Sequence, residues 1–323
     1  MTELAPTATR ERRVSRSKHR VGWGLAVLST LSLIAGDAKA DPQPPKQAEQ
    51  APPTQPTLPE MTVRAQREAL ERRAWAFVTS GIRKPFEASL SRWKDPICPL
   101  VVGLPPAEDK FVRVRLSEIA VAAGARLAPQ PCQANFAVIV ADEPEAVLRA
   151  WYKRDYHIFG DATENRINEW LNTPRTARVW YNTRSGSSSG LPYAIAPAGL
   201  KGSLPPGMHM AVDNSIEASH LVYNAVRDFS SVIVAIDSGR TKETNLNGLA
   251  DYAAMVGLAE IQPDADLGEV PTILRLFSAS EGGKPTSLSD WDTALLNALY
   301  KTGQENRYQR SEIIQSIVNH LAP

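Results

Sequence analysis

The spacing of hydrophobic residues along the chain predicts both helices and strands. Apolar residues three or four positions apart, the spacing of amphipathic helices, recur in five long segments: 60–80, 107–123, 245–260, 288–302 and 307–321. Shorter apolar or alternating runs, typical of strands, lie at 100–104, 135–141, 178–183, 220–224 and 230–237. Strands therefore predominate in the middle of the chain and helices in its C-terminal third.

The segment from residue 100 to residue 153 alternates between strand and helix. Pro105 and Pro106 end the first strand, Gly124 ends the first helix, and Asp142 is expected to cap a second helix over 143–153. This order predicts two parallel strands joined by a right-handed crossover. We therefore expect an α/β fold with an α+β tendency: a mixed sheet with a β-α-β-α N-terminal part and a helical C-terminal third.

Apolar side chains also predict which faces of these elements are buried. One stripe is expected in the helix over 60–80, formed by Val63, Leu70, Ala74 and Phe77, and Gly81 ends this helix. The inward residues expected in the helix over 107–123 are Phe111, Val114, Ile119 and Ala122. Val179 and Tyr181 share one face of their strand. A helix over 161–175 and a turn near 272–277 complete the prediction.

The first 40 residues have the layout of a secretory signal peptide. A basic stretch over 10–20 precedes an apolar run of 16 residues, Val21 to Gly36, and an A-x-A sequence ends at Ala40. We expect cleavage after Ala40 and a periplasmic or secreted protein. The alternative is an uncleaved inner-membrane anchor, but 16 residues are short for a hydrocarbon core about 30 Å thick. No other run approaches membrane length.

Composition and charge refine this picture. The whole chain carries 36 Lys+Arg and 35 Asp+Glu, but residues 1–40 hold seven of the basic and three of the acidic residues, which leaves a net charge of −3 for the rest. This balance disfavours a nucleic-acid partner. Residues 41–59 contain seven prolines and are expected to form an extended, disordered spacer. The predicted organisation is a signal peptide over 1–40, this spacer, and a single α/β domain over 60–323.

The chain's two cysteines, Cys98 and Cys132, each precede one of the two expected parallel strands. Adjacent starts of parallel strands can bring two Cα atoms within about 7 Å, which a disulfide requires. Export to an oxidising compartment favours the bonded form. We therefore predict a disulfide between Cys98 and Cys132 and not a reactive thiol.

Motifs for catalysis and cofactor binding are weak. Residues 186–190 match G-x-S-x-G, but Leu191-Pro192 follows, where a nucleophile elbow needs a helix. The histidines outside the signal peptide and the C-terminus are His157, His209 and His220, and none shows metal-ligand spacing. Asp155 and Asp161 near His157 are expected to belong to a solvated loop. We predict no catalytic, cofactor-binding or metal-ligating residue.

One helix carries a partial echo of a zinc protease motif. Placed on the metzincin pattern H-E-x-x-H-x-x-G-x-x-H, residues 250–260 keep the glycine as Gly257 and have Asp251 and Glu260 at two functional positions. Ala250 and Ala254 replace the first two histidines and offer no lone pair to a metal. Residues 271–274 resemble a Met-turn with leucine in place of methionine. The pattern is compatible with a decayed zincin-like scaffold that holds no zinc.

Four runs resemble a group of exported proteobacterial proteins of unknown function: 92–104, 132–140, 230–237 and 248–259. The resemblance implies export and a single domain and transfers no catalytic residue. We expect a non-catalytic protein that binds a ligand or an envelope protein. Its binding surface could be an aromatic patch, although these residues are better core candidates: Trp151, Tyr152, Trp170 and Trp180. The alternative is a hydrolase whose site is assembled from scattered residues around the 185–220 loop.

Overall fold

The computed structural model describes residues 58–83, 89–187, 194–195, 211–212, 225–241, 244–262, 264–278 and 283–322. The chain divides into two compact units, Met1–Thr54 and Gln55–Pro323, and every described residue belongs to the second. The predicted signal peptide, its cleavage after Ala40 and nearly all of the spacer lie outside these ranges. Within them, no helix has both the length and the apolar character needed to cross a membrane.

The centre of the second unit is a four-stranded mixed sheet. Its strands lie in the order β1 (Pro99–Val102), β2 (Phe136–Ala141), β6 (Ala225–Asp237) and β3 (Ala177–Ser187). β1, β2 and β6 are parallel, and β3 runs antiparallel to β6. A second pairing joins β4 (Ala194–Ile195) to β5 (Ala211–Val212). The predicted mixed α/β fold and the parallel pairing of the first two strands are confirmed.

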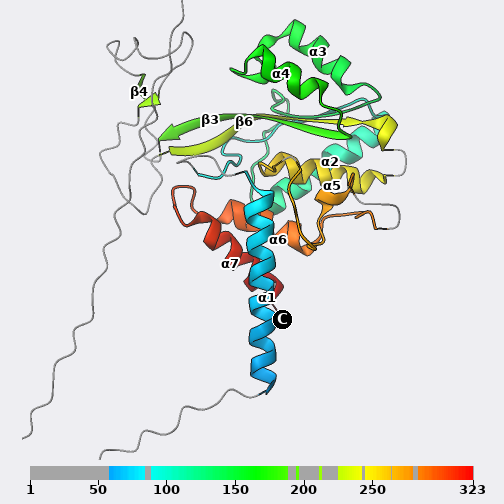
Figure 1. The fold of residues 1–323 in the computed structure, drawn as a ribbon. Helices are drawn as coiled ribbons and strands as arrows, with labels where there is room; N and C mark the ends of the chain where they lie inside the picture. The colour runs from blue at the N-terminus through cyan, green and yellow to red at the C-terminus, as the bar shows by residue number, and fades with distance from the viewer. Residues whose placement is uncertain are drawn as a thin grey trace, which may run out of the picture. The chain divides into compact units, whose positions relative to one another are not determined.

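Helices cover both faces of this sheet (Figure 1). One face carries α3 (Pro144–Arg154) and α4 (Glu164–Asn172), which are linked by the 3₁₀ turn η1 (Tyr156–Phe159). The other face carries α2 (Pro106–Ala123) and α5 (Leu246–Leu258). Three more helices pack below these: α1 (Leu58–Gly81), α6 (Asp290–Lys301) and α7 (Gln309–Leu321). Two 3₁₀ turns, η3 (Ser238–Arg240) and η4 (Ile273–Arg275), complete the elements.

Alternating side chains of the sheet divide the hydrophobic core in two. Val179 and Tyr181 pack on the larger core, beneath the sheet, while Trp180 between them packs on the smaller one with α3 and α4. The smaller core contains all four aromatic residues considered as a surface patch. Trp180 is 6% exposed, and Trp151, Tyr152 and Trp170 are partly buried against it. These aromatics therefore belong to the core, as the better of the two interpretations had it.

The predicted inward face of α2 is wrong at three of its four positions. Phe111 and Val114 are 43% and 47% exposed, and Ala122 is also exposed, whereas Ile119 is buried as predicted. The buried stripe consists of Val112, Leu116, Ile119, Ala120 and Ala123. Both stripes have helical spacing, so periodicity alone could not choose between them. The observed stripe has small residues near its C-terminal end, and α2 packs on α5.

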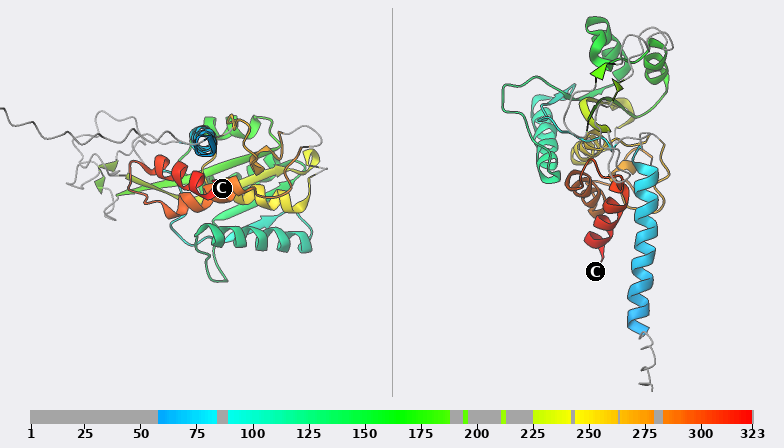
Figure 2. Two further views of the ribbon diagram at one scale, coloured as in Figure 1. Left: turned by 90° about the horizontal axis from the view of Figure 1, so that it is seen from below. Right: turned by 90° about the vertical axis from the view of Figure 1, so that its left-hand side faces the viewer.

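Two details of helix ends also differ from prediction. Val63 is 57% exposed because the N-terminal part of α1 projects beyond the rest of the unit (Figure 2), while Ala74 and Phe77 are buried. Glu143, not Asp142, is the N-cap residue of α3, and its side chain makes no capping hydrogen bond. Asp142 Oδ1 instead accepts a hydrogen bond from Ser238 Oγ (2.6 Å), which ties the ends of β2 and β6 together.

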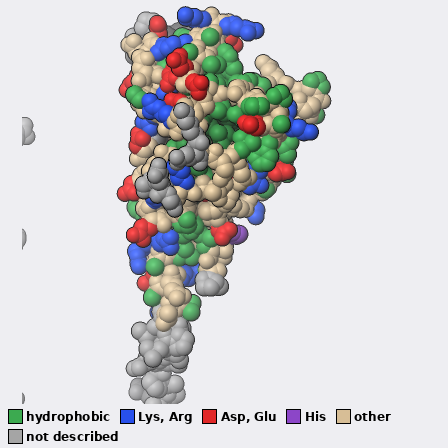
Figure 3. Space-filling model, turned by 90° about the vertical axis from the view of Figure 1, so that its right-hand side faces the viewer, with side chains coloured by type: hydrophobic (Ala, Val, Ile, Leu, Met, Phe, Trp, Pro, Cys, Tyr) green, Lys and Arg blue, Asp and Glu red, His purple; other side chains and the backbone are tan. Residues whose placement is uncertain are grey.

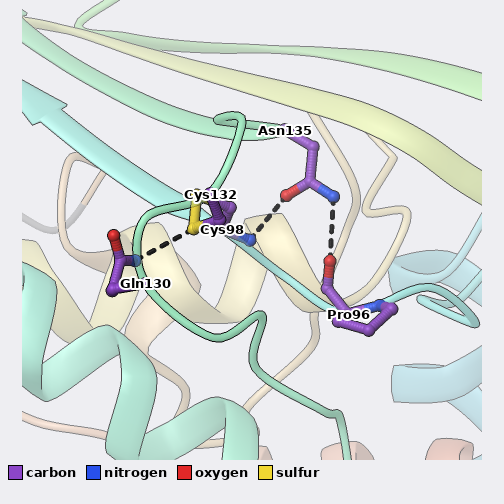
Figure 4. Close-up of a disulfide and its surroundings, with 5 residues drawn as sticks. All are labelled: Pro96, Cys98, Gln130, Cys132 and Asn135. Atoms are coloured by element: carbon purple, nitrogen blue, oxygen red, sulfur yellow. Dashed lines mark hydrogen bonds between the residues drawn. A yellow bond between two sulfur atoms is a disulfide. The ribbon is translucent and has the colours of Figure 1, made fainter.

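Cys98 and Cys132 lie together at the start of β1 and the approach to β2 (Figure 4). Their sulfur atoms are at disulfide distance and their Cα atoms are 6.0 Å apart, which is compatible with the predicted bond. Asn135 joins the same two segments, since its Oδ1 accepts from Cys98 N (2.7 Å) and its Nδ2 donates to Pro96 O (3.1 Å). The cysteine pair and the hydrogen bonds of Asn135 thus both connect the start of β1 to the segment that leads into β2.

Candidate functional site

A cleft of about 610 Å³ runs along the outer edge of β3. One wall comes from α4, including Trp170 and Thr173. The opposite wall comes from α5, the chain that follows it and the region of η4, including Tyr252, Gln262 and Phe277. Between the walls lie the residues of β3 itself, from Ala177 to Tyr181. The cleft therefore places an edge strand at its centre.

The hydrogen-bond pattern of the sheet shows which β3 residues face the cleft with their backbone. Asp237 N donates to Thr176 O (2.8 Å), so residues 176, 178, 180 and 182 direct their N–H and C=O groups toward β6. Ala177, Val179 and Tyr181 then direct theirs away from β6. No residue in the described ranges hydrogen-bonds to these outward backbone groups. Three donors and three acceptors of the backbone therefore line the cleft.

A buried carboxylate lies at the Tyr181 end of the cleft. Glu260 is 2% exposed, and its Oε2 accepts from Ser91 Oγ and from Arg227 Nη1, each at 2.6 Å. Arg83 Nε lies 3.5 Å from the other carboxylate oxygen. One negative charge thus faces two guanidinium groups, which leaves one positive charge in excess at this end.

Arg178 fastens the α4 wall to β3. It is almost fully buried and donates from Nη1 to Leu171 O (2.9 Å) and from Nη2 to Thr173 O (3.0 Å), carbonyls at the C-terminal end of α4. Nη2 also pairs with Glu145 Oε1 at 2.5 Å. Its buried Nε has no acceptor within the described part of the chain. The result is a wall that is fixed in place by side-chain contacts.

The remaining cations of the cleft lie on its walls. Arg175 forms a bidentate pair with Asp264 (2.7 and 2.6 Å), and this hydrogen bonding lowers the pKa of Asp264 and raises that of Arg175. The guanidinium of Arg166 lies 5.1 Å from the Trp180 ring centre, a cation–π contact. Five arginines and three carboxylates line the cleft, a net charge of +2. Elsewhere, on the face in Figure 3, basic and acidic side chains are interspersed.

Two tyrosines line the cleft, and both remain protonated at neutral pH. Burial raises the pKa of Tyr181, whose hydroxyl donates to Val256 O (2.8 Å) and accepts from Ile261 N (3.2 Å). It therefore anchors the chain that leaves α5. Burial also raises the pKa of Tyr252 to about 12, and its ring packs edge-on against Phe277, with 4.7 Å between centroids. Neither phenol is poised to exchange a proton at neutral pH.

The residues of the metzincin echo take structural roles. Asp251 is fully buried and accepts from Arg115 Nε (2.7 Å) and Leu288 N (2.7 Å), and thus has partners different from those of Glu260. Gly257 lies against Phe136, whose ring would be 1.8 Å from an added Cβ. Nothing in the fold supports the zincin-like scaffold. Close packing explains the glycine.

The segment compared with a Met-turn is held by α6. Asp292 accepts from Thr272 Oγ1 (2.5 Å) and Ile273 N (2.8 Å), and desolvation by burial raises its pKa. The same carboxylate completes a capping box with Ser289 at the start of α6. Asp292 therefore connects η4, which belongs to one wall of the cleft, to the helices beneath.

Other sequence candidates are dispersed. His157 is exposed in η1, where Asp155 caps the turn by accepting from the His157 backbone N–H (2.9 Å). Asp161 is also exposed. No group of three His, Cys, Asp or Glu side chains that could hold a metal ion occurs among the residues with described placement. His209, His220 and most of the 185–220 loop lie outside those ranges, so the alternative of a hydrolase there stays a prediction.

The sequence reasoning missed the cleft itself. Arg83, Arg227 and Glu260 come from three distant segments, and no local motif connects them. The available signal was the isolated arginine Arg178 at the start of an apolar strand, which predicts a buried partner. Comparison of the chain with protein-family models, curated proteins and solved structures found no match.

Proposed function

We propose that this chain is an exported, non-catalytic binding protein whose ligand lies in the cleft beside β3. The observation that carries the proposal is the cleft's construction: about 610 Å³, with backbone donors and acceptors along its centre and walls fixed by buried pairs. Fixed walls lower the entropic cost of binding. Ligand sites are concave and combine hydrophobic or aromatic side chains with polar groups that fix the ligand's orientation, and this cleft has both kinds of side chain.

The ionisable groups of the cleft support binding in preference to chemistry. Glu260 is held by Ser91 and Arg227, and the phenol of Tyr181 by backbone groups of the α5 end. Such groups are committed to one arrangement and suit recognition by shape and charge. Export is supported by the signal-peptide layout of residues 1–40 and by the resemblance to exported proteins.

A screen of the full chain by amide NMR tests the binding part of the proposal. A mixture of small polar molecules and short peptides is added, and binders are expected to shift the amide signals of Ala177 to Tyr181. The variant Ser278→Trp, at an exposed position of the cleft wall, should weaken those binders. Lys110→Trp on the exposed face of α2 is the matched control and should bind normally. Binders that shift only residues outside the cleft would contradict the proposal.

The export part is tested separately. Cell fractionation followed by N-terminal sequencing should give a periplasmic protein that begins at Asp41. An intact chain beginning at Met1 in the membrane fraction would support the uncleaved anchor instead.

A further inference from the structure

The free edge of β3 has the geometry of a site for one more strand. Three alternate residues, Ala177, Val179 and Tyr181, direct toward the cleft backbone groups that have no partner in the described part of the chain. Val232 N donates to Asn135 O (2.9 Å), which independently places the even-numbered β3 residues, and not these three, in the bonded positions opposite β6. An extended chain has the same spacing of donors and acceptors as this edge. The five residues from Ala177 to Tyr181 span about 14 Å.

A strand edge is normally protected. Natural sheets shorten, charge or cover their edge strands, because an exposed edge pairs with other chains. β3 has 11 residues and so is not shortened. Along Ala177 to Tyr181 residues of the cleft's two walls lie on both sides of the edge and limit access to it.

The charges of the cleft indicate which segment fits. The lining holds five arginines and three carboxylates, and Glu145 outside the lining pairs with Arg178, which leaves a net charge of +1. The chain without residues 1–40 has a net charge of −3. At one end, Arg83 is 43% exposed and shares the carboxylate of Glu260 with Arg227. On the α4 wall, Arg166 has its cation–π contact with Trp180 and no ion pair in the described ranges. Both guanidinium groups can donate hydrogen bonds to a carboxylate of the ligand.

We propose that the ligand of this cleft is an extended acidic peptide that pairs with β3 as an additional strand. This inference rests on the proposed function and names its ligand class. The chain's own segment 41–59 fits poorly, because seven of its residues are prolines without an N–H group and its two acids, Asp41 and Glu49, are accompanied by Lys46. A separate polypeptide, such as an exposed acidic segment of another exported protein, is the occupant.

The first experiment selects ligands from a library of random ten-residue peptides displayed on phage, with the purified full chain as bait. Enriched peptides should carry Asp or Glu and should lack proline at alternate positions. The best peptide is then resynthesised with N-methyl groups on either alternate set of residues. Methylation of the set that pairs with β3 should lower affinity about tenfold or more, and methylation of the other set only slightly. Equal effects of both sets would overturn the strand-addition proposal.

Two pairs of protein variants locate the peptide. Ala177→Pro removes one outward N–H without removing a bond to β6, and should weaken the peptide about tenfold; Ala177→Ser keeps the N–H and should bind like the parent. Arg83→Gln should lower the affinity for acidic peptides, and by a larger factor at low salt than at high salt. The remote variant Lys110→Gln should leave this affinity unchanged at both salt concentrations. Should Ala177→Pro fold poorly, the methylated peptides still decide the question.

The outcomes separate this inference from the proposed function. If N-methylation does not change the affinity of peptides that bind in the cleft, or if only small molecules bind there, strand addition is overturned and the proposal of a binding cleft stands. A library that yields no peptide would also overturn strand addition, and the small-molecule screen would then decide on the cleft by itself.

Discussion

The two edge strands of the sheet, β1 and β3, differ in length and in how their outer backbone groups are covered. At one edge, β1 has four residues, begins with a proline and is followed by Gly103. The residues before it are paired, since Ile97 exchanges backbone hydrogen bonds with Arg126 and Ala128. At the other edge, β3 has 11 residues, and along Ala177 to Tyr181 its outward backbone groups face a cleft and have no partner among the described residues. Short length, proline and local covering protect an edge from pairing. The comparison indicates that the β1 edge serves stability and the β3 edge serves recognition.

The means of support differ in the same way. The Cys98–Cys132 pair and tight backbone packing hold β1, whereas ion pairs and hydrogen bonds of buried polar side chains hold the surroundings of β3. Covalent and steric support is insensitive to pH and salt, but polar support depends on both. Variants at the two edges should therefore differ in size of effect and in response to conditions.

The largest effect is expected from Gly103→Ala at the end of β1. Gly103 has φ +94°, and an added Cβ would lie 1.8 Å from the carbonyl oxygen of Val140. Backbone strain and overlap together should lower the free energy of unfolding by about 4 kcal/mol, as measured by urea denaturation. Gly268→Ala is the control, because Gly268 also has positive φ (+57°) but open space around it, and should cost about 1 kcal/mol. Equal losses at both sites would contradict the packing argument.

The next effect concerns the cysteine pair. Replacing Cys98 and Cys132 together by alanine removes a link across 34 positions and should lower the unfolding free energy by about 3–4 kcal/mol under the chain-entropy model. Urea denaturation of the parent with and without reductant provides the comparison. A reductant should shift the parent to the midpoint of the double variant and leave the variant unchanged. If reductant does not change the urea midpoint of the parent, and two thiols can be titrated after denaturation, the bond does not form.

At the β3 side, Glu260→Gln should cost about 3 kcal/mol. The substitution leaves Arg83 and Arg227 facing each other without the carboxylate that they share. Glu169→Gln is the matched control, since Glu169 is an exposed acid of the same cleft, and should change stability by less than about 0.5 kcal/mol. Thermal unfolding of the two variants checks this, and similar stabilities would mean that the buried cluster does not hold the cleft together.

The smallest effect is expected from Asp264→Asn on the cleft wall. Asp264 has φ +59°, which asparagine also tolerates, so the change mainly removes the charge paired with Arg175. The pair is exposed and should contribute about 0.5 kcal/mol near neutral pH. Because pairing lowers the pKa of Asp264 in the folded protein, this contribution is present above the carboxyl's ordinary pKa and is lost as pH falls through the lowered one. Unfolding at pH 7 and at pH 2 should show a larger difference between parent and variant at pH 7.

Much of the fold could be predicted from local pattern. The apolar run over 230–237 predicts a strand, and it forms β6, which lies between β2 and β3. The position of two cysteines before two strands predicted their proximity, because parallel strands align their starts. The inward face of α2 could not be predicted, since two apolar stripes compete there and the choice depends on contact with α5.

The candidate site was beyond the reach of local pattern. Glu260 was noticed only as an echo of a zinc ligand, whereas its partners Ser91, Arg83 and Arg227 lie far away in the chain. The free edge of β3 depends on strand order, which puts β6 on one side and places no other described strand on the opposite side. Neither the order of strands nor long-range ion pairs follow from residue spacing.

The central place of β6 also has a kinetic consequence. β6 is the last of the four strands in the chain, yet it joins β2 to β3, and partners such as Phe136 and Val232 are roughly a hundred positions apart. Until residue 237 is available, β2 has an open apolar edge and β3 has no neighbour in the sheet. The sheet can therefore form only after contacts between residues far apart in the chain have closed a long loop. A chain interrupted before β6 keeps strands with unpaired, apolar edges, which are prone to aggregate.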